Sequence, residues 1–211
     1  MVLAEAAIAG ILLGLVSGGR LSALGELRIR RVELVYAAIL LQIVAFPSGI
    51  FPWSTPDGIA RGLWLLSFAL LIGFAAANRA VRGVALVFAG LASNLTAVVA
   101  NGGLMPASPH AVRAAGVAYR LHNNSISAVH PHLAWFTDRW AVPVWIPWGN
   151  VFSVGDALIA AGIVATIVLA MHGRSRPGAE RIERHNRPYL GYEIENERLS
   201  QTGAPTLDLK G

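Results

Sequence analysis

The sequence predicts an all-α integral membrane protein with five transmembrane helices and an extracytoplasmic cap of short helices between the fourth helix and the fifth. Hydrophobic residues make up 55% of the 211 residues and charged residues only 14%, and the charges are sparse until residue 172. Five apolar runs also approach the roughly 20 residues that a helix needs to cross a bilayer. In lipid the backbone must satisfy its own hydrogen bonds, which an α-helix does.

The predicted spans cover about residues 2–17, 32–50, 62–77, 83–100 and 154–171, so that residues 1–172 form one five-helix transmembrane domain. The first span is short enough to resemble a signal peptide. A signal peptide carries positive charge ahead of its apolar core, whereas here Glu5 precedes the core and Arg20 follows it. We therefore expect a retained first helix whose N-terminus lies outside the cytoplasm.

The distribution of basic residues predicts the orientation of the chain. With the N-terminus outside, the cytoplasmic segments carry thirteen basic residues and the outer segments carry four. Cytoplasmic loops are enriched in Lys and Arg, so this orientation is favoured. Seven of the thirteen lie in the tail, and without them the difference is six against four. The predicted location is the cytoplasmic (inner) membrane, with the C-terminus in the cytoplasm.

Residues 101–153 are predicted to form the outer cap, because a structureless loop of this length is uncommon. Ser108 and Pro109 are typical of a helix start and Gly116 of its end, and a second short helix is expected between Pro131 and Trp140. All six tryptophans fall on the outer side, and tryptophan prefers the membrane interface, so we expect an aromatic layer there. Residues 173–211 are polar and mixed in charge, and we expect a flexible cytoplasmic tail.

Small residues recur every four positions in the first span, at Ala6, Gly10, Gly14 and Gly18. At helical spacing they form one smooth stripe, along which another helix can approach closely in lipid. The fourth span repeats the pattern with Ala89, Ser93 and Ala97. We expect the first stripe to pack against another helix of this chain, and contact with a second copy of the chain is the alternative.

Four polar residues within or beside the spans are candidates for a ligand site: Gln42, Asn94, Asn101 and Asp156. Three of them also have a structural interpretation. Asn101, followed by glycines at 102 and 103, is typical of a helix end, and an amide such as Asn94 often bonds between helices. Ser153 and Asp156 have the spacing of a capping box. The alternative is a shared polar pocket near the outer face, with Gln42 and Asn94 lying deeper than the other two.

Several chemistries find no support in the sequence. There is no cysteine, so disulfides and thiolate chemistry are excluded. His110, His122, His130 and His132 lack the usual zinc spacings, so no metal and no cofactor are expected. Asp138 and Arg139 are read as a surface pair or a helix end. No basic-aromatic surface indicates a nucleic acid, and membrane lipids are the expected partners, with another membrane protein or a second copy of the chain as further alternatives.

Four stretches together resemble a known bacterial membrane-protein family: "GGRLSALGELRIR", "LLQ", "SNLTAVVANGGLMPAS" and "VFSVGDALIAAG". They are similar to the family called domain of unknown function 5317, over roughly residues 1–172. The family usually has valine after its Met-Pro, where this chain has Ala107. The resemblance implies a small multi-spanning inner-membrane protein and supplies no substrate. It directs attention to Gln42, Asn94, Asn101, Gly102, Gly103, Met105, Pro106, Ser153, Gly155 and Asp156.

Three function classes follow. The sequence favours a non-enzymatic membrane protein, either an accessory subunit or a binder of a small polar or lipid ligand near the outer face. The alternative is a membrane-embedded enzyme that acts on a lipid-linked substrate with Asp156 or Asp138 as general base, although no convincing acid–base pair is visible. A transporter component is a weaker alternative, because no inverted repeat is seen.

Overall fold

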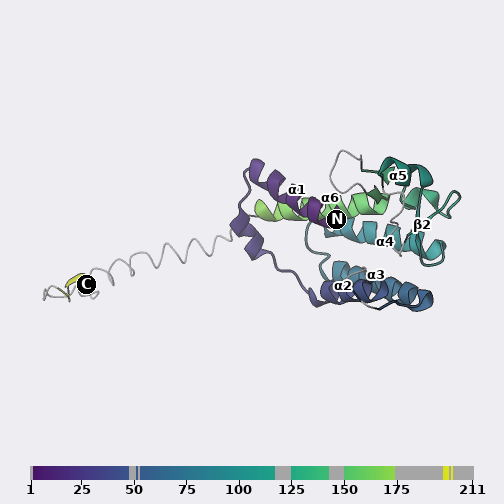
Figure 1. The fold of residues 1–211 in the computed structure, drawn as a ribbon. Coiled ribbons are helices and arrows are strands. Elements are labelled where there is room, and N and C mark those ends of the chain that lie inside the picture. Colours follow the sequence, from purple (N-terminus) through teal and green to yellow (C-terminus); the bar gives the residue numbers. More distant parts are fainter. Residues whose placement is uncertain are drawn as a thin grey trace. The chain divides into compact units, whose positions relative to one another are not determined.

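Apolar helices make up most of the first of two structural units, residues 1–172 (Figure 1). The computed structural model describes residues 2–47, 51, 53–116, 125–142, 150–173, 197–199 and 201. The second unit, residues 173–211, holds the predicted tail, and most of it lies outside the described residues. The long helices of the first unit are α1 (Val2–Val16), α2 (Glu33–Ala45), α3 (Asp57–Ala77), α4 (Val84–Ala100) and α6 (Val154–Met171).

Two of the described helices, α3 and α6, are long and apolar enough to cross a membrane. The other three are apolar but shorter. The 13 residues of α2 extend about 20 Å at 1.5 Å per residue, less than the roughly 30 Å of a bilayer's hydrocarbon core. The protein is therefore mostly helical with two candidate membrane-spanning helices, and the five-span arrangement stays a prediction. The third helix begins at Asp57 rather than at residue 62, and the second ends at Ala45.

The helices pack in an order that differs from their order in the chain. Helix α6 packs against both α1 and α4, and α3 packs against both α4 and α2. The spatial order is therefore α1, α6, α4, α3, α2, as the ribbon in Figure 1 shows. A short 3-10 helix, η1 (Leu21–Glu26), follows α1, and the Arg20 amide before it donates to Met171 O at 2.9 Å.

Glycines bring the backbones of α4 and α6 into direct contact. A Cβ added at Gly90 would collide with Gly155 O and come within 2.7 Å of Ile159, and one at Gly162 would lie 2.7 Å from the Val87 amide nitrogen. The stripe expected at Ala89, Ser93 and Ala97 is therefore wrong in part, because Gly90 faces α6 while Ala89 is exposed. Side chains at these glycine positions would push the two helices apart.

The small-residue stripe of α1 faces α6 over three of its four positions. Ala6, Gly10 and Gly14 are buried, and a Cβ on Gly10 or Gly14 would touch Ile167 or Met171. Gly18 does not belong to this stripe. It has a positive φ of 87° and nothing within 4 Å, because it ends the helix in the left-handed conformation that glycine adopts easily.

The cap contains short strands as well as a helix. Strand β1 (Met105–Ala107) pairs in parallel with β2 (Ser125–Ser127), and β3 (Trp140–Ala141) pairs antiparallel with β4 (Val151–Phe152). Helix α5 (Pro109–Ala114) begins after Ser108, and Gly116 follows with a positive φ, as the sequence predicted.

The second predicted cap helix is wrong. Only a 3-10 turn, η2 (Ala134–Phe136), lies in that stretch. It follows Leu133, whose left-handed φ of 52° interrupts a helix started at Pro131. The chain is then extended at Trp140. Four residues that the sequence analysis placed in the cap lie outside the described residues: His122, Pro143, Trp145 and Trp148.

The main hydrophobic core lies among α3, α4, α6 and β1. Trp64 is buried there, with its ring 5.1 Å from that of Phe46 and 5.9 Å from that of Phe68. Trp64 is therefore a core residue rather than part of an aromatic surface layer, whereas Trp135 in the cap is 70% exposed. A second, smaller core holds the cap together: Ala107, Ala111, Val112, Ala115 and Val151.

Candidate functional site

A network of hydrogen bonds joins α4 to the start of α6. Asn94 Nδ2 donates to Asp156 Oδ1 at 2.8 Å, and the Ser153 amide donates to Asp156 Oδ2 at 3.0 Å. The Ser153 hydroxyl lies 2.8 Å from Asn94 Oδ1 and 2.9 Å from Asp156 Oδ2, and it accepts from the Asp156 amide at 3.0 Å. We call Asn94, Ser153 and Asp156 the α4–α6 network. It includes the predicted capping box and extends it to a second helix.

Gly155 makes this network sterically feasible. A Cβ at that position would collide with Asn94 Oδ1 and lie 2.7 Å from Gly90 O. The absent side chain thus lets Asn94 reach across to the first turn of α6. Both carboxylate oxygens of Asp156 accept hydrogen bonds inside the chain, so this carboxylate has little capacity left for a substrate or ligand.

Asp138 is a buried carboxyl group, and one of its oxygens has no hydrogen-bond partner among the described residues. Its backbone continues the cap sheet, because its amide donates to Pro106 O at 2.9 Å and its carbonyl accepts from the Ser108 amide at 2.8 Å. The residue is only 8% exposed, and its Oδ1 has no hydrogen-bond partner among the described residues. A buried polar atom without a partner is uncommon in folded proteins.

The surroundings of Asp138 change its acidity. Burial, and secondarily the nearby carboxylate of Asp156, raise the pKa of Asp138 from 3.8 to about 8. Removing water penalises the charged carboxylate, and a second negative charge adds to that penalty. Asp138 therefore holds a proton at neutral pH and is able to donate a hydrogen bond as well as accept one.

The four polar residues expected to share one pocket do not meet. Gln42 Nε2 donates to Ser67 Oγ at 3.0 Å and so joins α2 to α3. Asn101 binds backbone alone: its Nδ2 donates to Ala97 O and His132 O, and its Oδ1 accepts from the His132 amide at 2.9 Å. The hydrogen bonds of the described residues therefore give no support to the shared pocket, which stays a prediction. Each amide finds its partner on a different neighbouring element, and only Asn94 and Asp156 come together.

The glycines after α4 turn the chain into the cap. Gly102 and Gly103 have positive φ angles of 70° and 86°, which glycine adopts without strain. A Cβ added at Gly103 would lie 3.3 Å from the side chain of Arg61, and Arg61 Nη1 donates to Gly102 O at 3.3 Å. Met105 and Pro106 then lie buried in β1. The glycine and proline motif thus shapes the connection from α4 to the cap.

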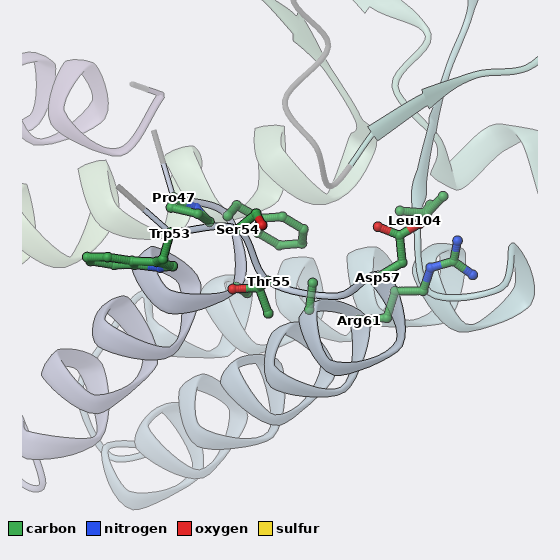
Figure 2. Close-up of a pocket in the computed structure, with 10 residues that line it drawn as sticks. Pro47, Trp53, Ser54, Thr55, Asp57, Arg61 and Leu104 are labelled. Atoms are coloured by element: carbon green, nitrogen blue, oxygen red, sulfur yellow. The ribbon is translucent and has the colours of Figure 1, made fainter. Parts of the chain in front are cut away.

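A pocket of about 410 Å³ lies between the end of α2 and the start of α3. Figure 2 shows Trp53 on one side of it and Arg61 on the other, with Leu104 beside Arg61. Aromatic and apolar side chains form much of its wall, and Asp57 and Arg61 add charge. The sequence did not predict this pocket, although the aromatic and proline-rich stretch before α3 was a signal for it.

Two further residues were missed or misread at the sequence level. Arg139 does not pair with Asp138, because its guanidinium lies 4.8 Å from the ring centroid of Trp135. Asn78, at the end of α3, was not singled out, yet its side chain binds the backbone of Arg30, 48 residues earlier. Its signal was an asparagine directly after an apolar run, the same position that Asn101 occupies after α4.

The described residues contain no group of three or more His, Cys, Asp or Glu side chains placed to hold a metal ion. His122 lies outside the described residues. His132 takes part in the fold through its backbone, which binds Asn101. The chemistry of the site is therefore that of carboxyl, amide and hydroxyl groups.

Comparison with known proteins identifies a family. The model of a family described as "Family of unknown function (DUF5317)" matches residues 26–168. The chain belongs to the DUF5317 family. The resemblance found in the sequence is thereby confirmed.

This DUF5317 chain is also 28% identical, over 148 residues, to a protein of Thermotoga maritima titled "Uncharacterized protein". The match covers 67% of this chain and 80% of that relative. No solved structure matches this chain. The family match includes Asn78, Asn94, Asp138 and Asp156 but not α1 with its small-residue stripe.

Proposed function

We propose that this DUF5317 protein is a five-span protein of the cytoplasmic membrane that binds a small polar ligand near its outer face without catalysing a reaction. Its N-terminus is outside and its C-terminus is cytoplasmic. The membrane placement is supported by large apolar side chains exposed along all the long helices. Leu12 on α1, Leu40 on α2 and Ile59 on α3 are each more than half exposed. Lipid would cover these faces, whereas water would leave large apolar patches uncovered.

The single observation that carries the binding proposal is the unpartnered Oδ1 of Asp138. Asp156, whose charge acts on Asp138, is bonded to the side chains of Asn94 and Ser153. A polar atom buried without a partner costs free energy that a suitable ligand would recover. A hydroxyl, amine or ammonium group suits this position, because each donates a hydrogen bond and none adds negative charge next to Asp156.

A lipid bound in the pocket of Figure 2 is the second candidate. Phe46, Trp53 and Leu104 offer an apolar wall, and Arg61 places a positive charge at the same pocket. An acyl chain against the wall and an anionic headgroup near Arg61 would match that arrangement, although Asp57 on the lining opposes it.

The enzymatic alternative rests on Asp138 rather than on Asp156. Both oxygens of Asp156 are engaged in the α4–α6 network, which leaves it poorly suited to accept a proton from a substrate. A carboxyl with a pKa of about 8 has the acidity of a general acid or base at neutral pH. An accessory subunit and a transporter component are further alternatives. In both, the site at Asp138 would act together with a partner protein.

Purification of the full chain in mild detergent, followed by mass spectrometry of everything that co-purifies, tests the proposal. We expect a small polar compound to accompany the wild type and Asp57→Asn, an exposed carboxyl at the start of α3. The compound should be lost from Asp138→Leu. Monodisperse elution of the variant shows that it is folded. Retention of the compound by Asp138→Leu would overturn the proposed site, and turnover of the compound would favour the enzyme.

A further inference from the structure

Five arginines lie at the ends of the helices opposite the cap. Three precede α2 and two lie in the turn between α3 and α4. We call them the basic cluster: Arg28, Arg30, Arg31, Arg79 and Arg82. All five are exposed. Figure 1 shows the segment after α1 at the end of the helices that is distant from α5 and β2.

Asn78 brings the two groups of arginines together. The Arg30 amide donates to Asn78 Oδ1 at 2.8 Å, and Asn78 Nδ2 donates to Arg30 O at 2.8 Å. Asn78 Nδ2 also lies 2.9 Å from Phe74 O, one turn back in α3. Asn78 is buried at 3% exposure. This two-point contact fixes the backbone of Arg30 beside the residue that precedes Arg79, so the cluster is held in place before any ligand arrives.

The charge of the cluster is largely uncompensated within the described residues. Arg31 pairs with Glu33 at 3.4 Å, and both side chains are more than 60% exposed. Such an exposed pair contributes little and is screened by salt. No ion pair with Arg28, Arg30, Arg79 or Arg82 occurs in the described part of the chain. Within the part of the chain that the structure describes, four arginines thus remain available to an external anion.

Exposed apolar side chains accompany the arginines. Leu21 is 51% exposed, Ile29 is 49% exposed and Val32 is 46% exposed. All three lie on the same segment between α1 and α2. Arginine interleaved with large apolar residues is typical of segments that lie in a membrane interface, where the apolar groups enter the acyl boundary and the cations meet the headgroups. A soluble anion would gain nothing from contact with these apolar residues, whereas the acyl chains of a lipid would pack against them.

We propose that the basic cluster binds the phosphate of an anionic phospholipid in the cytoplasmic leaflet. This inference rests on the membrane placement under Proposed function but not on the outer ligand site. Arginine forms paired hydrogen bonds to phosphate oxygens, and anionic lipid attracts basic segments next to a membrane helix. Leu21, Ile29 and Val32 would lie beside the acyl chains of the same lipid.

Native mass spectrometry of the full chain in detergent, with added phosphatidylglycerol or phosphatidylcholine, tests this proposal. We expect clear preference for phosphatidylglycerol, reduced at high salt. Arg30→Gln with Arg79→Gln should weaken phosphatidylglycerol binding about tenfold or more. Arg113→Gln with Arg139→Gln removes the same charge from the cap and should leave binding unchanged. Equal binding of the two lipids, or equal losses in the two double variants, would overturn the proposal.

The Asn78→Ala variant distinguishes the effect of the arginines' position on lipid binding from the effect of their charge. It removes the contact with Arg30 and keeps every arginine, so we expect phosphatidylglycerol binding to fall although the net charge is the same. If this variant does not fold, the paired charge variants decide the question. Inorganic phosphate at the same concentration should compete poorly, and full competition would indicate a phosphate site rather than a lipid site. Absence of the chain from the membrane fraction would instead defeat the placement under Proposed function.

Discussion

At the scale of single residues, two neighbouring carboxyls differ because their surroundings differ. Asp156 is satisfied by the Ser153 amide and by Asn94, whereas Asp138 Oδ1 is buried without a partner. Because two negative charges close together repel, the charge on Asp156 favours the neutral form of Asp138. Asp138 therefore holds a proton near neutral pH.

The first prediction concerns the pH dependence of stability. The folded pKa of Asp138 is about 8 against an ordinary value of 3.8, so the folded state binds this proton more tightly than the unfolded state. The free energy of unfolding should therefore be highest below pH 4, fall as the pH rises from 4 to 8, and level off above 8. The full effect is on the order of 5 kcal/mol. Thermal melts in detergent from pH 5 to pH 9 follow the part of this decline that lies above pH 5.

The same melts on Asp138→Asn provide the control. Asparagine is similar in size and does not titrate, so the decline between pH 5 and pH 8 should largely disappear. An equally steep decline in Asp138→Asn would show that another group titrates. Asp57→Asn, an exposed carboxyl, should keep the wild-type profile.

At the scale of elements, the contact between α4 and α6 depends on glycine. Gly155→Ala and Gly90→Ala each place a methyl group against the backbone of the partner helix. We expect each to destabilise the fold by about 1–3 kcal/mol or more, because the helices must separate. Gly62→Ala in α3 is the matched control, since a Cβ there has nothing within 4 Å. Melting temperatures in one detergent compare them, and equal effects at positions 62 and 155 would contradict the glycine contact.

A second prediction for elements concerns the tether between α4 and the cap. Asn101→Ala removes both of its contacts with the backbone of His132. The stretch around η2 should then exchange its amide hydrogens faster, because its opening costs about 1–3 kcal/mol less. Hydrogen exchange followed by mass spectrometry measures the exchange rate of each segment separately. Exchange in α3 should stay unchanged, and faster exchange throughout the helices would indicate general destabilisation instead.

Local signals in the sequence predicted some elements and not others. The start of α5, the stop signal at Gly116 just after its end and the capping box at Ser153 follow from residues next to one another in the chain. The partners of Gln42 and Asn101 do not, because the spacing of residues on a helix gives a face and not the element that covers it. The burial of Asp138 was missed for the same reason. Its burial depends on pairing with β1, about thirty residues earlier.

At the scale of the whole molecule, helix order and charge distribution agree with one path of the chain through the membrane, in which it crosses five times with its N-terminus outside. Helix α6 lies between α1 and α4 in the spatial order, and the residues paired across the contacts show that α1 and α6 run parallel while α4 runs antiparallel to α6. The ends of α1, α3 and α6 thus lie at one end of the first unit, next to the basic cluster. The cap connects α4 to α6 at the other end.

The last prediction is the topology that this arrangement requires. In a chain crossing the membrane five times, a periplasm-dependent reporter should be active at the N-terminus, and a fluorescent protein that folds in the cytoplasm should be active at the C-terminus. Charge provides the physical reason, since thirteen basic residues belong to the proposed cytoplasmic side and four to the outer side. Reporters inserted after Arg82 and after Arg113 should report opposite compartments. Both termini in one compartment would require an even number of crossings, and because α1 and α6 run parallel, such a result would contradict the five-span threading itself.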